Sequence, residues 1–235
     1  YEGVEVFNFS LSLQSEEYIK EDFMKNLSIR SESIERIFSY YQDNMFIVNR
    51  RYQRKLVWTQ EEKVSFINSI YNKFPVPLIL LAQDQENNFE IIDGMQRLNA
   101  ITSFIIGEFP LLLNDKAYYF DLDAISETKM LKDTGELMQK TPVLDRKICV
   151  DIASYPLPIS ITEIKSYEDI DNIFRRINSG GRHLSRQEIR QAGVLSNFAT
   201  LVRNISSQIR GDRSSTDIVN LNNMHKISIT NKALD

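Results

Sequence analysis

The amino-acid sequence predicts an α+β fold, in which helices pack on a small mixed sheet and a mainly helical C-terminal part follows. Apolar residues recur at helical spacing over several segments. Short apolar runs bounded by turn residues are typical of strands. The last third contains repeated helix-capping patterns. With 235 residues, 42% of them hydrophobic, the chain is long enough to bury a sizeable core.

The first two predicted helices have clear N-terminal signals. Apolar residues recur at helical spacing over residues 34–41, after two serines that can cap a helix. Thr59 and Glu62 have the spacing of a capping box, and the amphipathic helix behind them must stop before Pro75.

Three short strands are predicted around these helices. Residues 45–48 form the first, and residues 78–81 and 89–92 form an antiparallel pair joined by a polar turn. A helix follows at residues 95–106, where Gly107 ends it.

The middle of the chain is predicted to contain strands at residues 118–120, 148–150 and 159–161, and a helix within residues 124–139. We therefore divide the chain into four parts: a helical N-terminal segment at 1–44, an α+β core at 45–165 with an insertion near 110–145, a helical lobe at 166–210, and a polar tail or the start of a following domain at 211–235.

Composition excludes several classes of protein. No apolar run approaches the roughly 18 residues of a membrane helix, so no membrane partner is expected. The single cysteine, Cys149, excludes a framework of intramolecular disulfides and fits the reducing cytoplasm. Two histidines make a zinc site of Cys/His type unexpected. The chain begins without Met or a signal-peptide pattern, and we expect a piece of a longer protein.

The most informative segment is residues 91–98, in which an apolar strand runs through Asp93 and Gly94 into a helix. A helix N-terminus has unpaired N–H groups and partial positive charge, so it binds phosphate well. Gly94 allows a ligand to approach the backbone, while Gln96 and Arg97 add an amide and a fixed cation. The alternative is an ordinary Asp-Gly turn followed by a solvated arginine.

Basic residues are clustered although the formal net charge is −4. Arginine forks bind phosphate, and neighbouring aromatic rings can stack on bases. The alternative is a pair of solvated charge runs, with the glycines between the last helices serving only as a cap and connector. The clusters are Arg50, Arg51, Arg54 and Lys55, beside Tyr52 and Trp58, and Arg175, Arg176, Arg182, Arg186 and Arg190, around Gly180-Gly181.

The acidic residues of the middle region do not predict a metal site. Asp121, Asp123, Asp145 and Asp151 are scattered in the sequence, and we interpret them as a charged, solvated face.

Taken together, these segments resemble the N-terminal domain of the GmrSD family of modification-dependent restriction enzymes. The match consists of Tyr52-Gln53-Arg54 with Val57-Trp58, the apolar run from Pro75 to Leu81, Ile92 to Leu98, and Phe174 to Arg190. It spans about residues 34–195. One position departs from the family pattern, which has Asp-Gly-Gln-Gln-Arg where this chain has Met95 after Gly94.

The resemblance implies a ParB/sulfiredoxin-like core that binds and hydrolyses a nucleoside triphosphate with Mg²⁺. It also implies control of DNA cleavage by a C-terminal nuclease domain that is absent from this chain. The expected catalytic residues are Asp93, Gln96 and Arg97, with Asp93 also the metal ligand. The expected nucleotide-binding residues are Gln53, Arg54, Gly94, Met95, Asn178 and Gly181, and the expected DNA-binding residues are Arg50, Arg51 and Arg182.

Two other functions are compatible with the same residues. The domain could be a DNA-binding or protein-interaction module without turnover, which the Met95 substitution favours. It could also nick DNA itself, with Asp93 as a metal ligand, although no second carboxylate is placed nearby by sequence spacing. DNA and a second copy of the chain are further candidate partners.

Overall fold

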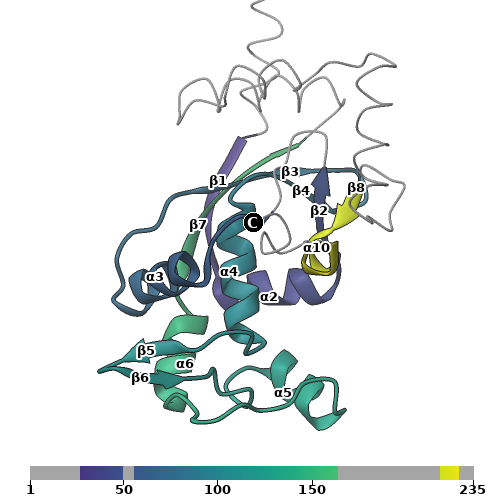
Figure 1. The fold of residues 1–235 in the computed structure, drawn as a ribbon. Coiled ribbons are helices and arrows are strands. Elements are labelled where there is room, and N and C mark those ends of the chain that lie inside the picture. Colours follow the sequence, from purple (N-terminus) through teal and green to yellow (C-terminus); the bar gives the residue numbers. More distant parts are fainter. Residues whose placement is uncertain (1–26, 50–55, 164–217, 228–235) are drawn as a thin grey trace, which may run out of the picture.

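The computed structural model describes residues 27–49, 56–163 and 218–227, and there the chain forms a six-stranded mixed sheet with helices packed against it (Figure 1). The strand order is β1-β7-β3-β4-β2-β8. The strands are β1 (Leu27–Ser33), β2 (Phe46–Asn49), β3 (Ile79–Gln83), β4 (Phe89–Asp93), β7 (Pro156–Glu163) and β8 (Ile218–Asn220). The helices are α2 (Ile34–Gln42), α3 (Gln60–Tyr71), α4 (Met95–Ile105), α5 (Ser126–Asp133), α6 (Arg146–Ala153) and α10 (Leu221–Ile227). The predicted α+β class is confirmed.

The centre of the sheet contains the predicted strand pair. β3 and β4 are antiparallel, with Leu81 opposite Ile91, and β4 continues directly into α4. β2 runs parallel to β4 on one side, and β7 runs parallel to β3 on the other. The C-terminal ends of β2 and β4 therefore lie at the same end of the sheet, where α4 begins.

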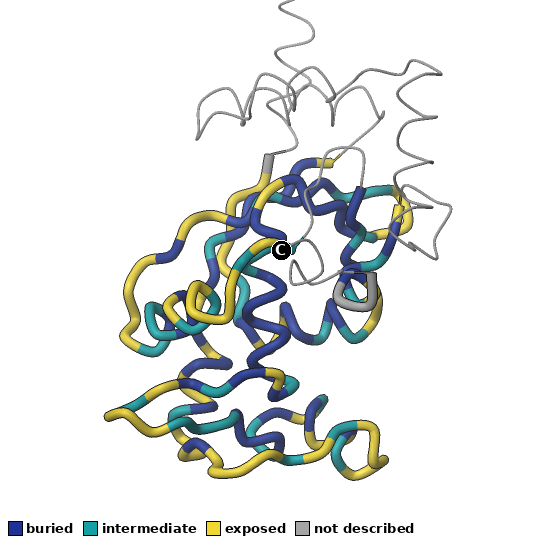
Figure 2. The backbone as a smooth tube through the Cα atoms, viewed as in Figure 1, coloured by how far each residue is buried: buried dark blue, intermediate teal, exposed yellow. Residues whose placement is uncertain are grey.

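The core lies between the sheet and the helices α2, α3, α4 and α6 (Figure 2). α4 is buried on almost every side, and Leu98, Ile101 and Phe104 are at most 1% exposed. The predicted helix at residues 95–106 is confirmed, and α2 and α3 both contact it. A helix so enclosed is held rigidly at its N-terminus.

The caps predicted for α2 and α3 are present. The Ser33 side chain accepts a hydrogen bond from Arg36 N at 3.1 Å. At α3, Thr59 Oγ1 accepts from Glu62 N at 3.3 Å, and Glu62 Oε2 accepts from Thr59 N at 2.8 Å, which completes a capping box.

A smaller lobe lies beside this layer and consists of β5 (Leu111–Leu113), β6 (Lys116–Tyr118), α5 and α6 (Figure 1). The predicted strand at residues 148–150 is wrong, because these residues lie inside α6. Asp145 caps this helix by accepting from Lys147 N at 2.8 Å, and Cys149 and Ile152 are buried at helical spacing. An apolar run of three residues cannot distinguish a strand from one face of a short helix.

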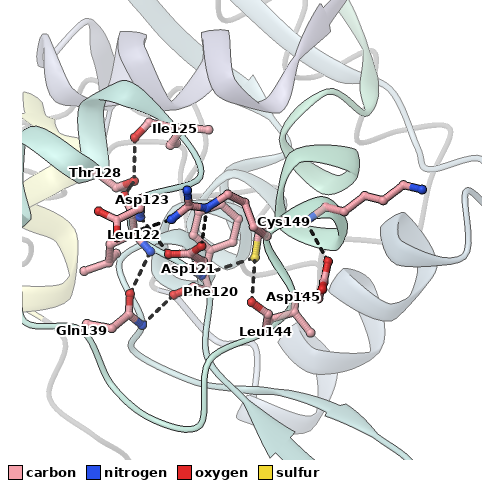
Figure 3. Close-up of polar contacts among 12 residues, drawn as sticks. Phe120, Asp121, Leu122, Asp123, Ile125, Thr128, Gln139, Leu144, Asp145 and Cys149 are labelled. Atoms are coloured by element: carbon pink, nitrogen blue, oxygen red, sulfur yellow. Dashed lines mark hydrogen bonds and ion pairs between the residues drawn. The ribbon is translucent and has the colours of Figure 1, made fainter.

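Polar side chains hold the lobe together from within (Figure 3). Gln139 bridges the backbone of residues 120–122, since its oxygen accepts from Leu122 N at 2.9 Å and its nitrogen donates to Phe120 O at 3.0 Å. Asp121 is 8% exposed and accepts from Arg146 Nε at 2.9 Å. The interpretation of the acidic residues as a solvated face is therefore wrong for Asp121, which is buried by the packing of α6 against the 120–123 segment.

Both ends of the described chain add strands that the sequence patterns did not predict. β1 lies within the segment expected to be helical and pairs antiparallel with β7 along its full length. Ile218–Ile227, expected in a polar tail or a following domain, instead supplies β8, which pairs with β2, and α10. Asn222 Nδ2 donates to Tyr41 O at 2.7 Å, so α10 also contacts the end of α2.

Candidate functional site

The turn between β4 and α4 places an acidic residue at a strand end and glycine at a helix start. Gly94 is the N-cap of α4 and has φ +103°, a conformation that side chains with a Cβ rarely adopt. A Cβ at this position would lie 3.0 Å from Ile79 Cγ1 and 3.2 Å from Ile79 Cγ2. Glycine is therefore required both by the backbone angle and by the close approach of β3.

An irregularity of the sheet sets the direction of Asp93. Leu80 pairs with Asp93 but Leu81 pairs with Ile91, so β4 has one extra residue, Ile92, at this point. Such bulges turn the end of a strand and change the direction of its side chains. The Asp93 side chain is 53% exposed, whereas Ile91 is 1% exposed. The bulge thus ends the strand with a carboxylate at the surface.

Asp93 and Arg97 form an ion pair one helical turn apart. The Asp93 carboxylate accepts a hydrogen bond from Arg97 Nη2, and the Arg97 side chain is only 11% exposed. Burial of the side chain and its bond to Asp93 leave the guanidinium little freedom, so a cation is fixed beside the N-terminus of α4. Its N-cap residue is glycine, which has no side chain with which to cap this N-terminus. Backbone N–H groups, the helix dipole and a guanidinium together favour an anion here.

Gln96 connects this turn to a distant segment of the chain. Its Oε1 accepts from Val57 N at 3.0 Å and from Trp58 N at 3.2 Å. Trp58 in turn packs edge-on against Phe66 of α3, with the ring centroids 5.5 Å apart. The side chain therefore anchors the backbone that follows the first basic cluster to the start of α4.

Met95 is directed into the protein. It is 3% exposed and belongs to the hydrophobic core. Any contact that Met95 makes with a phosphate must therefore come from its backbone N–H. The departure from the family pattern at this position places an apolar side chain where the core can accommodate it.

The remaining predicted site residues lie outside the described residues. They are Arg50, Arg51, Gln53 and Arg54 of the first cluster and Asn178, Gly181 and Arg182 of the second. Asn49, which ends β2, is 2% exposed, and Leu56 is half-buried. Because β2 is parallel to β4, Asn49 and Asp93 are the last residues of neighbouring strands and lie at the same end of the sheet. The residues that flank the first cluster thus lie on the same side of the sheet as the Asp-Gly turn.

Two contacts of this site were not predicted. Ile79 bounds the turn at Gly94, and the Val57–Trp58 backbone occupies the oxygen of Gln96. Both contacts join residues far apart in the sequence. Only the predicted pairing of β3 with β4 could have indicated that Ile79 lies beside Gly94. In the part of the chain that the structure describes, no group of three or more histidine, cysteine, aspartate or glutamate side chains could hold a metal ion.

Comparison with known proteins identifies the family. The model of the GmrSD restriction endonuclease N-terminal domain matches residues 34–195. The chain belongs to this family. The matched region contains the Asp93-Gly94 turn and both basic clusters, so the GmrSD domain includes every predicted site residue. No curated protein and no solved structure matches the chain.

Membership of the GmrSD family makes the chain part of a restriction, or phage-defence, protein. None of the helices within the described ranges has the length and apolar character needed to cross a membrane.

Proposed function

We propose that this GmrSD domain binds a nucleoside triphosphate with Mg²⁺ and hydrolyses it, and that turnover regulates DNA cleavage by a nuclease domain outside this chain. The observation that supports this most is the α4 N-terminus, where the N-cap is a glycine without a capping side chain and the Asp93–Arg97 pair lies beside it.

The phosphates would lie at the N-terminus of α4, against its first backbone N–H groups, including that of Met95. Arg97 would bind a phosphate oxygen through the face of the guanidinium fork that Asp93 leaves open, and would stabilise the charge that develops during transfer. Further phosphate contacts would come from Gln53, Arg54, Asn178 and Gly181.

Asp93 fits a role at a divalent cation. Its side chain is more than half exposed, so the carboxylate can reach an ion carried by the triphosphate while it keeps Arg97 in place. Mg²⁺ is commonly held by one or two carboxylates together with phosphate oxygens and waters. When bound, the ion would neutralise charge on the phosphates.

Gln96 is proposed to orient the reacting groups. Its oxygen is bonded to the backbone at Val57 and Trp58, so the residue sets the distance between the Asp-Gly turn and the chain that carries the first basic cluster. A change in that distance is a route by which nucleotide would alter DNA contacts. Arg50, Arg51 and Arg182 are proposed for those DNA contacts.

The test is calorimetric titration of ATP, GTP, CTP and UTP with Mg²⁺ into the wild type and into Arg97→Ala. Arg36→Ala on α2 is the matched control, because it also removes a guanidinium but belongs to a helix N-terminus remote in sequence from the turn. We expect binding of at least one triphosphate by wild type and Arg36→Ala, with at least a tenfold loss, about 1.4 kcal/mol, in Arg97→Ala.

The outcomes separate the candidate functions. Binding followed by phosphate release supports the NTPase, and circular dichroism must show that Arg97→Ala is folded. Failure of folded wild type to bind any triphosphate refutes the proposal. A DNA affinity that falls steeply with salt and does not respond to nucleotide would indicate a DNA-binding module instead.

A further inference from the structure

β1 is an edge strand of the described sheet, and the proposed nucleotide chemistry does not use it. β1 pairs with β7 over all seven of its residues, and among the described strands its other edge has no neighbour. Residues 28–31 are exposed in succession (Figure 2). Ile29 is 70% exposed. A regular edge of this length presents backbone N–H and C=O groups that can pair with another strand.

Charge on this edge is self-complementary. Arg30 Nε lies 2.9 Å from Glu32 Oε1, and the two residues share a face because they are two positions apart on one strand. Two antiparallel copies of β1 related by a twofold axis at Ser31 would place Arg30 opposite Glu32 of the second copy, and Glu32 opposite its Arg30. The two intrachain pairs would then join into a ring of four alternating charges.

Neighbouring registers are less favourable. A twofold axis at Arg30 would place the two Arg30 side chains opposite each other, and an axis at Glu32 would place the two Glu32 side chains opposite each other. Like charges in directly opposite positions destabilise a strand pair. An axis at Ile29 would pair Arg30 with Ser28 and leave Glu32 beyond the paired residues. The axis at Ser31 is therefore the register that the charges select.

We propose that β1 is a homodimerisation edge, through which a second copy of this chain continues the sheet in antiparallel register centred on Ser31. The occupant is a second copy because a twofold axis satisfies both charges with the residues of this strand alone. In that arrangement the two six-stranded sheets become one, and the helical layers of the two copies lie on the same face.

Cysteine crosslinking tests the register directly. The only cysteine of the chain, Cys149, is fully buried, so an introduced thiol at the edge is the only one available to a partner. At the proposed axis, Ser31→Cys meets its own copy and should give a disulfide-linked dimer under mild oxidation. Ile29→Cys, on the same strand and more exposed, faces Ser33 of the second copy and should crosslink much less.

Charge exchange tests the origin of the pairing. Light scattering of the wild type should show a mass that rises with concentration to twice that of the monomer. Arg30→Glu should shift the dimer–monomer midpoint at least tenfold to higher concentration, and Arg30→Glu with Glu32→Arg should restore it. Circular dichroism provides the folding control for these exposed positions.

Several results would overturn the proposal. They are a wild type that stays monomeric at every concentration, a dimer that Arg30→Glu leaves intact, a double variant that remains as weak as Arg30→Glu, or crosslinking through Ile29→Cys in preference to Ser31→Cys.

Discussion

Replacement of Gly94 by alanine measures how closely the turn at the candidate site is built. The change has two costs in the structure. Gly94 has φ +103°, and a residue with a Cβ loses about 1–2 kcal/mol in the left-handed region. The new Cβ would also lie 3.0, 3.2 and 3.3 Å from three atoms of Ile79, and such overpacking typically costs about 1–3 kcal/mol.

Gly107→Ala separates these two costs. Gly107 also has a positive φ, +74°, but a Cβ there would meet no atom within 4 Å. Both variants gain the same stability from the smaller entropy of the unfolded chain. The difference between them therefore reports mainly the contact with Ile79, and we expect Gly94→Ala to be less stable than Gly107→Ala by about 1–3 kcal/mol.

Urea denaturation followed by circular dichroism is the appropriate assay. With a slope of about 2 kcal/mol per molar, a difference of 2 kcal/mol moves the midpoint by about 1 M. In an Ile79→Ala background the nearest two atoms are removed, so the cost of Gly94→Ala should approach that of Gly107→Ala. Equal midpoints for the two single variants, or no relief from Ile79→Ala, would refute the reasoning.

Three further predictions concern other contacts of the fold. Gln96→Ala removes the acceptor of two backbone N–H groups and should lower the free energy of unfolding by about 1–3 kcal/mol. Gln96→Glu keeps an oxygen at this position and should lose less stability. Equal losses of the two variants in urea titrations would contradict this prediction. Thr59→Ala should cost about 1 kcal/mol through loss of the α3 cap, and a thermal midpoint equal to that of wild type would exclude the effect. Burial raises the pKa of the Cys149 thiol from its ordinary value of 9.0 to about 11, so the unfolded chain releases this proton first as pH rises. Stability should therefore be lost between pH 9 and pH 11, by roughly 2–3 kcal/mol, and Cys149→Ala should flatten this part of the pH profile.

The sequence was most informative where a pattern is local. The capping box at Thr59 and the helix after Gly94 depend on contacts within four residues, and both were predicted correctly. The β3–β4 pair was predictable for the same reason, since a short polar turn joins its strands. The Asp-Gly turn could be recognised as a candidate site because strand, glycine and helix follow one another without interruption.

Three elements that depend on distant partners were not predicted. α6 contains a short apolar run that is compatible with a strand until Asp145 and the packing of Cys149 against the 120–123 segment are known. β1, LSIRSES, alternates apolar and polar residues only over its first four positions, and it forms because β7 lies beside it. β8 is only three residues long and forms by pairing with β2, from which more than 160 positions separate it.

The sequence by itself determined the α+β class, the GmrSD resemblance and the position of the Asp93-Gly94 turn, because these depend on residue types at short, fixed spacing. The tertiary structure decided what each side chain of that turn does. It directs Met95 into the core, commits the oxygen of Gln96 to the backbone at Val57 and Trp58, and places Ile79 where only glycine fits. Side-chain direction depends on neighbours brought together by folding, and those neighbours have no fixed spacing in the chain.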